Sequence, residues 1–182
     1  MQLKKNKIIL GIFVLMILVL ILWEIPIRKK IFFIDGSVHE IYWTRGVLSQ
    51  VKNGHSLSFN PDGTLIADDH FKSGILHGNC TYYYDNGKLR GIVTYDAGKL
   101  MNILKYLDVN GHNLNFGDFS NGNGNLKLYY ENGILEEEGQ MKNGYRNGVW
   151  VYYLNPDNPL IKAFTTYNNG VDQYGLYLKW AF

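Results

Sequence analysis

The sequence predicts an all-β protein: a single-layer antiparallel meander of about five and a half β-hairpin repeats, preceded by one N-terminal transmembrane helix. Three observations lead to this prediction. Glycines recur in phase about every 24 residues, Asn-Gly dipeptides occur nine times, and residues 8–23 form an unbroken apolar run. A fixed period of this length is typical of repeat architectures, in which each unit buries a face by stacking on its neighbours.

The apolar run reads IILGIFVLMILVLILW and contains no charge. As a helix it would cover roughly 24 Å, and an extension through Ile27 brings it closer to the ~30 Å hydrocarbon core of a bilayer. The residues that follow, WEIPIRKK, offer no small-residue cleavage site, which argues against a signal peptide. We therefore expect an uncleaved single-pass membrane anchor at residues 8–27.

The orientation of this anchor depends on the basic residues beside it. Three lysines precede the apolar run and three basic residues follow it, so the positive-inside comparison is tied. A short basic tail before the first apolar segment usually stays in the cytoplasm. We therefore expect a membrane protein whose repeat domain lies on the extracytoplasmic side.

The repeat becomes visible when the chain is aligned on glycine. The starts of successive units lie 24, 24, 22, 24 and 27 residues apart. The starting residues are Gly54, Gly78, Asn102 (in place of glycine), Gly124, Gly148 and Gly175. In the first four units a second glycine follows nine positions later, at Gly63, Gly87, Gly111 and Gly133. Several columns in phase indicate a true internal repeat.

The Asn-Gly dipeptides predict tight turns, because both residues tolerate the positive φ of a type I′ hairpin turn. The segments between turns are rich in Tyr, Leu, Val, Thr and Ile, and they alternate as strands do. Cys80, Tyr82 and Tyr84, for example, share one strand face. Two strands per unit predict about eleven strands in one sheet.

The chain divides into three parts. Residues 1–30 hold the membrane anchor with its basic flanks, residues 31–53 a linker or a diverged first hairpin, and residues 54–182 the repeat domain. Six of the 18 Lys and Arg lie in the first part, which leaves twelve basic and fifteen acidic residues, a net charge of −3, in the remainder. Nucleic-acid binding depends on neutralising phosphates, so this mild acidity argues against a nucleic-acid partner.

The repeats contain YYDNG, YYENG, the G-x-W-x-Y-Y of Gly148 to Tyr153, and the closing motifs KNG and NNG. With these motifs, residues 54–180 resemble bacterial MORN-repeat variant proteins, and within that group the YwqK-type proteins classed as antitoxins of toxin–antitoxin systems. The resemblance implies MORN-like β-hairpin repeats that serve as a scaffold, a membrane-proximal binding surface or an antitoxin. An antitoxin role makes a toxin one candidate partner.

Residues that could carry chemistry are few. Asp68, Asp69 and His70 form the only compact carboxylate–imidazole cluster, but alternation along a strand turns Asp69 away from the other two. Cys80 is the single cysteine, which excludes a disulfide framework, and a catalytic thiol would need a nearby His, for which His77 is the local candidate. We expect no enzyme, no metal site and no cofactor.

Large aromatic residues recur at the repeat spacing, most with the same strand parity. They are Tyr82, Tyr84, Tyr106, Tyr130, Trp150, Tyr152 and Tyr177. Two interpretations stay open: rings that pack the sheet, or an exposed strip that binds a partner, since Tyr and Trp are favoured anchors at interfaces. The main functional hypothesis is a membrane-tethered module that binds a protein as scaffold, immunity protein or antitoxin. The alternative is a cell-envelope module that binds glycan or lipid headgroups through the strip.

Overall fold

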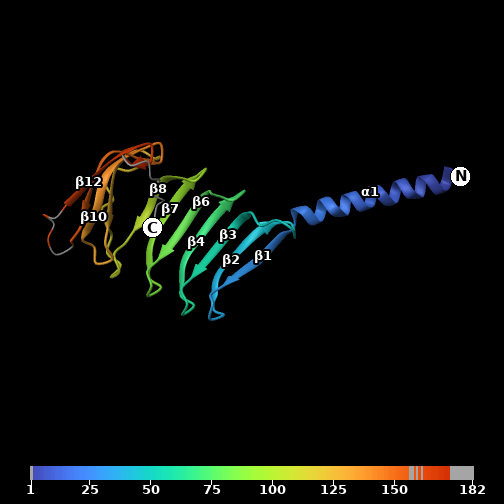
Figure 1. The fold of residues 1–182 in the computed structure, drawn as a ribbon, viewed down its shortest axis with the longest axis horizontal. Coiled ribbons are helices and arrows are strands. Elements are labelled where there is room, and N and C mark those ends of the chain that lie inside the picture. The colour runs from blue at the N-terminus through green and yellow to red at the C-terminus, as the bar shows by residue number, and fades with distance from the viewer. Residues whose placement is uncertain (1, 156–157, 159, 161, 173–182) are drawn as a thin grey trace.

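The structure is a computed structural model that describes residues 2–155, 158, 160 and 162–172. In this part of the chain a helix, α1 (Gln2–Glu24), is followed by strands that run antiparallel to their neighbours (Figure 1). The strands are β1 (Pro26–Phe32), β2 (Val38–Arg45), β3 (Lys52–Phe59), β4 (Leu65–Lys72), β5 (Ile75–Leu76), β6 (Gly78–Tyr83), β7 (Leu89–Asp96), β8 (Lys99–Tyr106), β9 (Gly124–Tyr129), β10 (Leu135–Lys142), β11 (Tyr145–Tyr153), β12 (Lys162–Asn168) and β13 (Val171–Asp172). The predicted antiparallel meander of hairpins is confirmed.

The strands form two sheets, whereas the sequence predicted one. The first sheet has the order β1-β2-β3-β4-β6-β7-β8, with β5 beside β4, and the second has the order β13-β12-β11-β10-β9. Between them, the chain from residue 107 to residue 123 makes only isolated bridges. Side chains there bond to nearby backbone: Asp118 accepts from the amide of Asn125 at 2.5 Å, and Asn115 accepts from that of Gly117 at 3.0 Å. Such local bonds compete with a strand ladder, so the degenerate third unit interrupts the sheet.

The chain after α1 enters the sheet at once. Pro26 lacks an amide donor and disfavours a helical residue before it, which accounts for the helix ending at Glu24. β1 then pairs with β2 from Pro26–Arg45 to Phe32–Val38. The basic residues 28–30, predicted as a flank of the anchor, therefore lie in a strand at the edge of the sheet. Within the residues whose side chains are described, no helix has both the length and the apolarity needed to cross a membrane.

Two kinds of turn alternate along the array. At one end of the hairpins are five-residue turns, in which the amide of the first residue donates to the carbonyl of the fifth: Phe33–Ser37, Asn60–Thr64, Tyr84–Lys88, Asp108–His112 and Tyr130–Ile134. At the other end are two-residue turns in which both residues have positive φ, as in type I′ turns: Ser73-Gly74, Ala97-Gly98, Asn121-Gly122, Asn143-Gly144 and Asn169-Gly170.

Each two-residue turn is bonded to the preceding unit of the array. The amide of the turn glycine donates to a carbonyl of the preceding unit, at 2.8 Å from Gly74 to Lys52 and at 2.9 Å from Gly98 to Leu76. The corresponding amides of Gly122, Gly144 and Gly170 donate in the same way. At three of these turns an Asn side chain of the preceding unit also accepts from the amide of the first turn residue: Asn53 from Ser73, Asn102 from Asn121 and Asn123 from Asn143. Backbone and asparagine groups together therefore hold neighbouring units in register at this end.

Tyrosine hydroxyls connect successive units at the opposite end. Each donates to a backbone carbonyl 23 residues further along: Tyr84 to Leu107 at 2.7 Å, Tyr106 to Tyr129 at 3.3 Å and Tyr130 to Tyr153 at 2.7 Å. The amide of Tyr129 also donates back to the Tyr106 hydroxyl at 3.0 Å. Because Tyr106 lies in β8 and Tyr129 in β9, this pair joins the two sheets.

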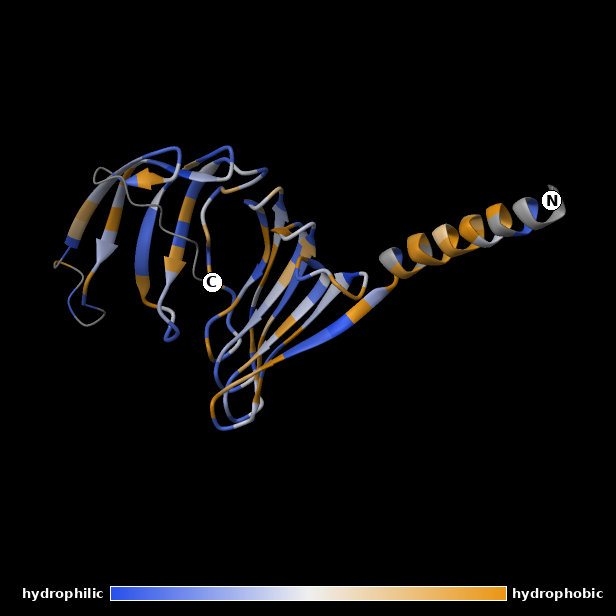
Figure 2. Ribbon diagram, turned by 45° about the vertical axis from the view of Figure 1, so that its right-hand side comes forward, coloured by the Kyte–Doolittle hydropathy of each residue, from blue (hydrophilic) through white to orange (hydrophobic). Residues whose placement is uncertain are grey.

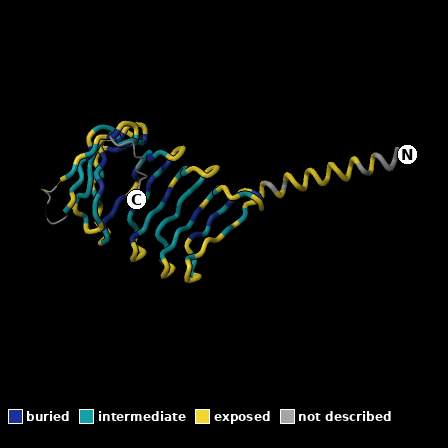
Figure 3. The backbone as a smooth tube through the Cα atoms, in the orientation of Figure 1, coloured by how far each residue is buried: buried dark blue, intermediate teal, exposed yellow. Residues whose placement is uncertain are grey.

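In β2, β7 and β9 buried residues alternate with more exposed ones, whereas β1 and β4 contain no buried residue (Figure 3). In β7, Gly91, Val93 and Tyr95 are buried while the residues between them are not. A single core cluster runs through both sheets: Cys80, Val93, Tyr95, Leu100, Ile103, Tyr106, Phe119, Leu126, Leu128, Met141, Trp150 and Tyr167. Figure 2 shows the contrast with α1, where hydrophobic residues follow one another without the alternation seen in the strands.

The type I′ turns lead to a prediction about Ala97. This residue has a φ of 47°, a conformation that costs most L-residues about 1–2 kcal/mol and that Asn adopts readily. Asn143 occupies the same turn position with a φ of 52°. We expect Ala97→Asn to raise the free energy of unfolding by about 1 kcal/mol and Asn143→Ala to lower it by a similar amount. Urea unfolding of the detergent-solubilised chain measures both, and equal stabilities for all three proteins contradict this account.

Candidate partner-binding surface

Three members of the predicted aromatic strip are buried. Tyr84, Tyr106 and Trp150 keep 3%, 2% and 0% of their surface exposed. The indole nitrogen of Trp150 donates to the carbonyl of Gln140 at 3.0 Å, inside the molecule. These rings therefore pack the array and present no surface to a partner. Tyr177 lies outside the described residues.

The other three members are half-buried, and their hydroxyls are engaged internally. Tyr82 donates to Asp69 Oδ1 at 2.9 Å, Tyr130 donates to the backbone of the next unit, and the Tyr152 hydroxyl lies 2.6 Å from that of Tyr167. A residue that packs the sheet and a residue that binds a partner both recur at every second position of a strand. The sequence therefore left both interpretations open. For the described tyrosines and Trp150, the contacts seen are those of packing.

A buried arginine organises the second sheet. Arg146 donates to both carboxylate oxygens of Glu137, at 2.5 and 2.6 Å, and its guanidinium lies 4.0 Å from the centre of the Trp150 ring. It also donates to the Tyr152 hydroxyl at 2.7 Å. Burial alone would lower the pKa of Arg146, but the hydrogen bonds and charge of Glu137 raise it overall. A charge so fully paired holds β10 and β11 together and is not available to a ligand.

The pairing of β9 to β12 places two different rows of side chains on the two faces of this sheet. On the inner face lie Leu126, Gly139, Trp150 and Thr165. A β-carbon on Gly139 would overlap the Trp150 indole, so the glycine makes room for the ring. On the outer face, in the adjacent register, lie Lys127, Glu138, Val151 and Phe164.

The outer face carries exposed apolar side chains on β11 and β12. Phe164 is 62% exposed and Val149 is 57% exposed, and Val151 between them is half-buried. Val151 and Phe164 are direct cross-strand partners, so the three residues form one apolar patch across β11 and β12. The sequence prediction missed this patch because it considered only the strand face that carries Trp150. Val149 and Val151 alternate with Trp150 and so lie on the other face, and this alternation was the signal that could have revealed the patch.

Polar contacts border the patch. Glu138 lies 3.8 Å from the Lys127 ammonium group and accepts a hydrogen bond of 2.7 Å from Tyr153. The ammonium group of Lys162 lies 4.7 Å from the centre of the Tyr153 ring. The bond to Glu138 also raises the pKa of Tyr153, so this phenol stays neutral at physiological pH. An apolar centre with a polar border is the usual composition of a protein-binding surface.

The candidate catalytic residues do not meet in one site. Asp68 Oδ1 accepts a hydrogen bond from His55 Nδ1 at 2.8 Å, and the rings of His55 and His70 lie 5.0 Å apart, on one face of β3 and β4. Cys80 is buried in the core on the other face and touches His70 only through the backbone amide, at 3.4 Å. Burial raises the pKa of the Cys80 thiol to about 12, so it is protonated at neutral pH. Among the described residues, no group of three or more His, Cys, Asp or Glu is placed to hold a metal ion.

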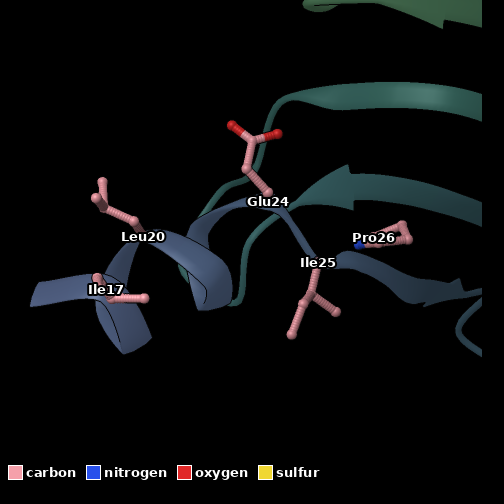
Figure 4. Close-up of a pocket in the computed structure, with 5 residues that line it drawn as sticks. All are labelled: Ile17, Leu20, Glu24, Ile25 and Pro26. Atoms are coloured by element: carbon pink, nitrogen blue, oxygen red, sulfur yellow. The ribbon is translucent and has the colours of Figure 1, made fainter. Parts of the chain in front are cut away.

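A shallow apolar hollow lies where α1 meets the sheet. Figure 4 shows its lining: Ile17 and Leu20 from the last turns of α1, and Glu24, Ile25 and Pro26 at the junction with β1. Among these residues only Glu24 is polar. The hollow is open to one side and offers no convergent polar groups that could orient a small substrate.

The repeats match a known family at two places. Residues 76–97 and 122–143 match the family model of the MORN repeat variant. The first segment contains β6 and β7, and the second contains β9 and β10. Each match is therefore one hairpin of the array. No curated protein and no solved structure matches the chain. MORN repeats are often involved in binding proteins or membrane lipids.

Asp69 leads to a prediction about pH. Burial raises the pKa of this carboxyl, although the bond from Tyr82 opposes the shift. The native state therefore binds this proton more tightly than the unfolded chain, and its contribution to stability is lost as pH rises through the folded pKa. The amide of Asp69→Asn has no charge to desolvate and still accepts from Tyr82. We expect the stability of this variant relative to the wild type to increase between pH 4 and pH 7.

Asp62→Asn is the control with the opposite sign. Hydrogen bonds from Thr64 lower the pKa of Asp62, so this carboxylate contributes stability above its unfolded pKa. The stability of Asp62→Asn relative to the wild type should fall as pH rises toward the unfolded pKa of about 3.9 and should then stay level. Urea unfolding at several pH values measures both differences. Parallel curves for the wild type and both variants would show that neither carboxyl is perturbed.

Proposed function

We propose that this protein is a membrane-anchored, non-enzymatic repeat module that binds a protein partner through the outer face of its second sheet. The observation that carries the proposal is the exposed apolar patch of Val149, Val151 and Phe164. Exposed apolar side chains that are adjacent and bordered by polar groups are typical of protein interaction sites. Phe164, the most exposed member of the patch, is the kind of residue that anchors an interface.

The absence of an assembled reactive site among the described residues supports a binding role. The Cys80 thiol is protonated and buried, and Asp68 and His70 face away from it. The glycan alternative required an exposed aromatic strip, and the described tyrosines of that strip use their hydroxyls inside the molecule. A protein partner fits the observed surface better than a sugar, which would need free polar groups beside the rings.

Membrane anchoring by α1 is supported by the exposure of its side chains. The large apolar side chains described in α1 are between 43% and 64% exposed, so the sheets cover none of them. They lie around the whole circumference of the helix, whereas a helix lying flat on a membrane has one polar face. The single-pass interpretation also draws on Ile8, Ile21 and Trp23, whose side chains lie outside the described ones.

The role in the cell follows from the partner. A toxin as partner gives the antitoxin or immunity function that the resemblance to YwqK-type proteins implies, and an assembly of envelope proteins gives a scaffold function. An extracytoplasmic repeat domain favours immunity against an exported toxin over neutralisation of a toxin inside the cell.

Site-specific crosslinking tests the patch. A photoreactive phenylalanine analogue at position 164 of the full chain should crosslink to one defined protein in intact cells. The same analogue at Leu104, which is 57% exposed in the first sheet, is the matched control and should not. Val149→Asp should reduce the crosslink at position 164 at least several-fold by placing a charge in the patch. Equal crosslinking from both positions would contradict a specific surface.

Fractionation and protease protection test the anchor and its orientation. The wild type should stay in the membrane pellet after alkaline extraction, and Leu15→Arg combined with Leu18→Arg should move it to the soluble fraction, because charges are costly in hydrocarbon. Protease added to intact cells should remove a C-terminal tag. A tag that is cut only after lysis would place the repeats inside the cell and overturn the proposed orientation.

A further inference from the structure

The hairpin next to α1 has exposed apolar side chains at both of its ends. At the far end, the turn Phe33–Ser37 carries Ile34, which is 109% exposed, and Phe32 before it is 56% exposed. At the near end, the loop after β2 carries Leu48, 84% exposed, and Val47, 57% exposed. None of the equivalent five-residue turns combines an exposed aromatic residue with an exposed isoleucine, so this is a property of the first hairpin.

The loop with Leu48 is fixed beside the end of α1. The amide of Gly46 donates to the carbonyl of Ile25 at 2.9 Å, and Arg45 lies 3.5 Å from Glu24. The ammonium group of Lys29 donates to the carbonyl of Ser49. These contacts hold the loop next to the apolar hollow drawn in Figure 4, where the helix meets β1.

Basic side chains lie between the two apolar ends. β1 contains Arg28, Lys29 and Lys30, and Arg28 and Lys30 are exposed. β1 is also the outermost strand of its sheet, so this charge lies along the edge nearest to α1 (Figure 1). The chain after residue 30 carries a net charge of −3. β1 therefore carries three positive charges and no acid, whereas the chain that follows is net negative and places Asp35 in the adjoining turn.

We propose that this edge, formed by β1, the turn Phe33–Ser37 and the loop at residues 46–51, rests on the surface of a bilayer that contains anionic phospholipid. Ile34 and Leu48 enter the interfacial layer, and Arg28 and Lys30 face the lipid phosphates. The proposal rests on the anchoring by α1 proposed above and specifies how the first hairpin sits against that membrane.

The shape of the edge fits a bilayer better than a protein pocket. β1 has seven residues and therefore spans about 23 Å. Ile34 and Leu48 lie at the two ends of this strand, and Arg28 and Lys30 lie between them. A bilayer surface is flat and extended, with negatively charged phosphates over an apolar interior, and so offers a partner to each of these groups. Basic side chains beside an apolar segment are attracted to anionic lipid in this way.

Fluorescence quenching in vesicles tests the proposal on the full chain. Ile34→Cys and Leu48→Cys are each labelled with an environment-sensitive dye and reconstituted in vesicles of phosphatidylglycerol and phosphatidylcholine that contain a quencher on the acyl chains. Asp85→Cys is the matched control, because residue 85 occupies the same position in the turn Tyr84–Lys88 as residue 34 does in its own turn. Cys80 is buried, and treating the unsubstituted chain with the dye measures any labelling of Cys80 itself.

We expect quenching at positions 34 and 48 to exceed that at position 85 at least threefold. Arg28→Gln combined with Lys30→Gln should reduce it toward the control value, whereas Lys88→Gln combined with Lys105→Gln, two exposed lysines elsewhere, should not. Vesicles of phosphatidylcholine alone should also give less quenching, which identifies the anionic headgroup as the ligand.

Flotation of the same samples separates the two proposals. If the chain floats with the vesicles but position 34 is quenched no more than position 85, anchoring by α1 is supported and the proposed contact of the first hairpin with the bilayer is contradicted. If the chain does not float, anchoring by α1 fails and the hairpin proposal fails with it. Equal quenching with and without phosphatidylglycerol overturns the role of Arg28 and Lys30.

Discussion

The hydrogen bond from a tyrosine hydroxyl to the backbone of the next unit is the interaction on which this array depends. A hairpin of two strands is marginally stable alone, so each unit needs its neighbours. The bonds from Tyr84, Tyr106 and Tyr130 supply this connection at one end of the hairpins, and the turn glycines supply it at the other. The Tyr106 bond matters most, because it continues the array across the gap where the strand ladder stops.

Features that depend on short segments could be predicted from the sequence. Three Asn-Gly pairs, at residues 121–122, 143–144 and 169–170, form the predicted type I′ turns, and the alternation of residues specified strands, because both effects act within a few residues. In Asn86-Gly87 and Asn132-Gly133 only the glycine has a positive φ, and both pairs lie in five-residue turns. The break between the sheets depends on bonds such as that of Asp118 with Asn125, which a repeat pattern does not encode. The strand at residues 26–32 was hidden for a related reason: its basic residues fitted the flank of an apolar helix equally well.

The candidate site was harder to predict because a strand has two faces with the same period. Trp150 and Val151 are adjacent, and only the cross-strand neighbours decide which of them is buried. Gly139 opposite Trp150 leaves room for the indole, and Arg146 lies over the same ring, so this face became the core. Val151 and Phe164 were left on the exposed face as a consequence. The aromatic residues that looked most suited to binding were therefore the ones most needed for packing.

Because the strands lie side by side, the length of the array depends on the number of its repeats. Neighbouring strands of a sheet lie about 4.8 Å apart, so each hairpin added to either sheet lengthens that sheet by about 10 Å. Gain or loss of one 24-residue unit by recombination would change this length by a fixed step and leave both ends intact. Selection can therefore change the number of repeats without changing the residues of α1 or of the patch.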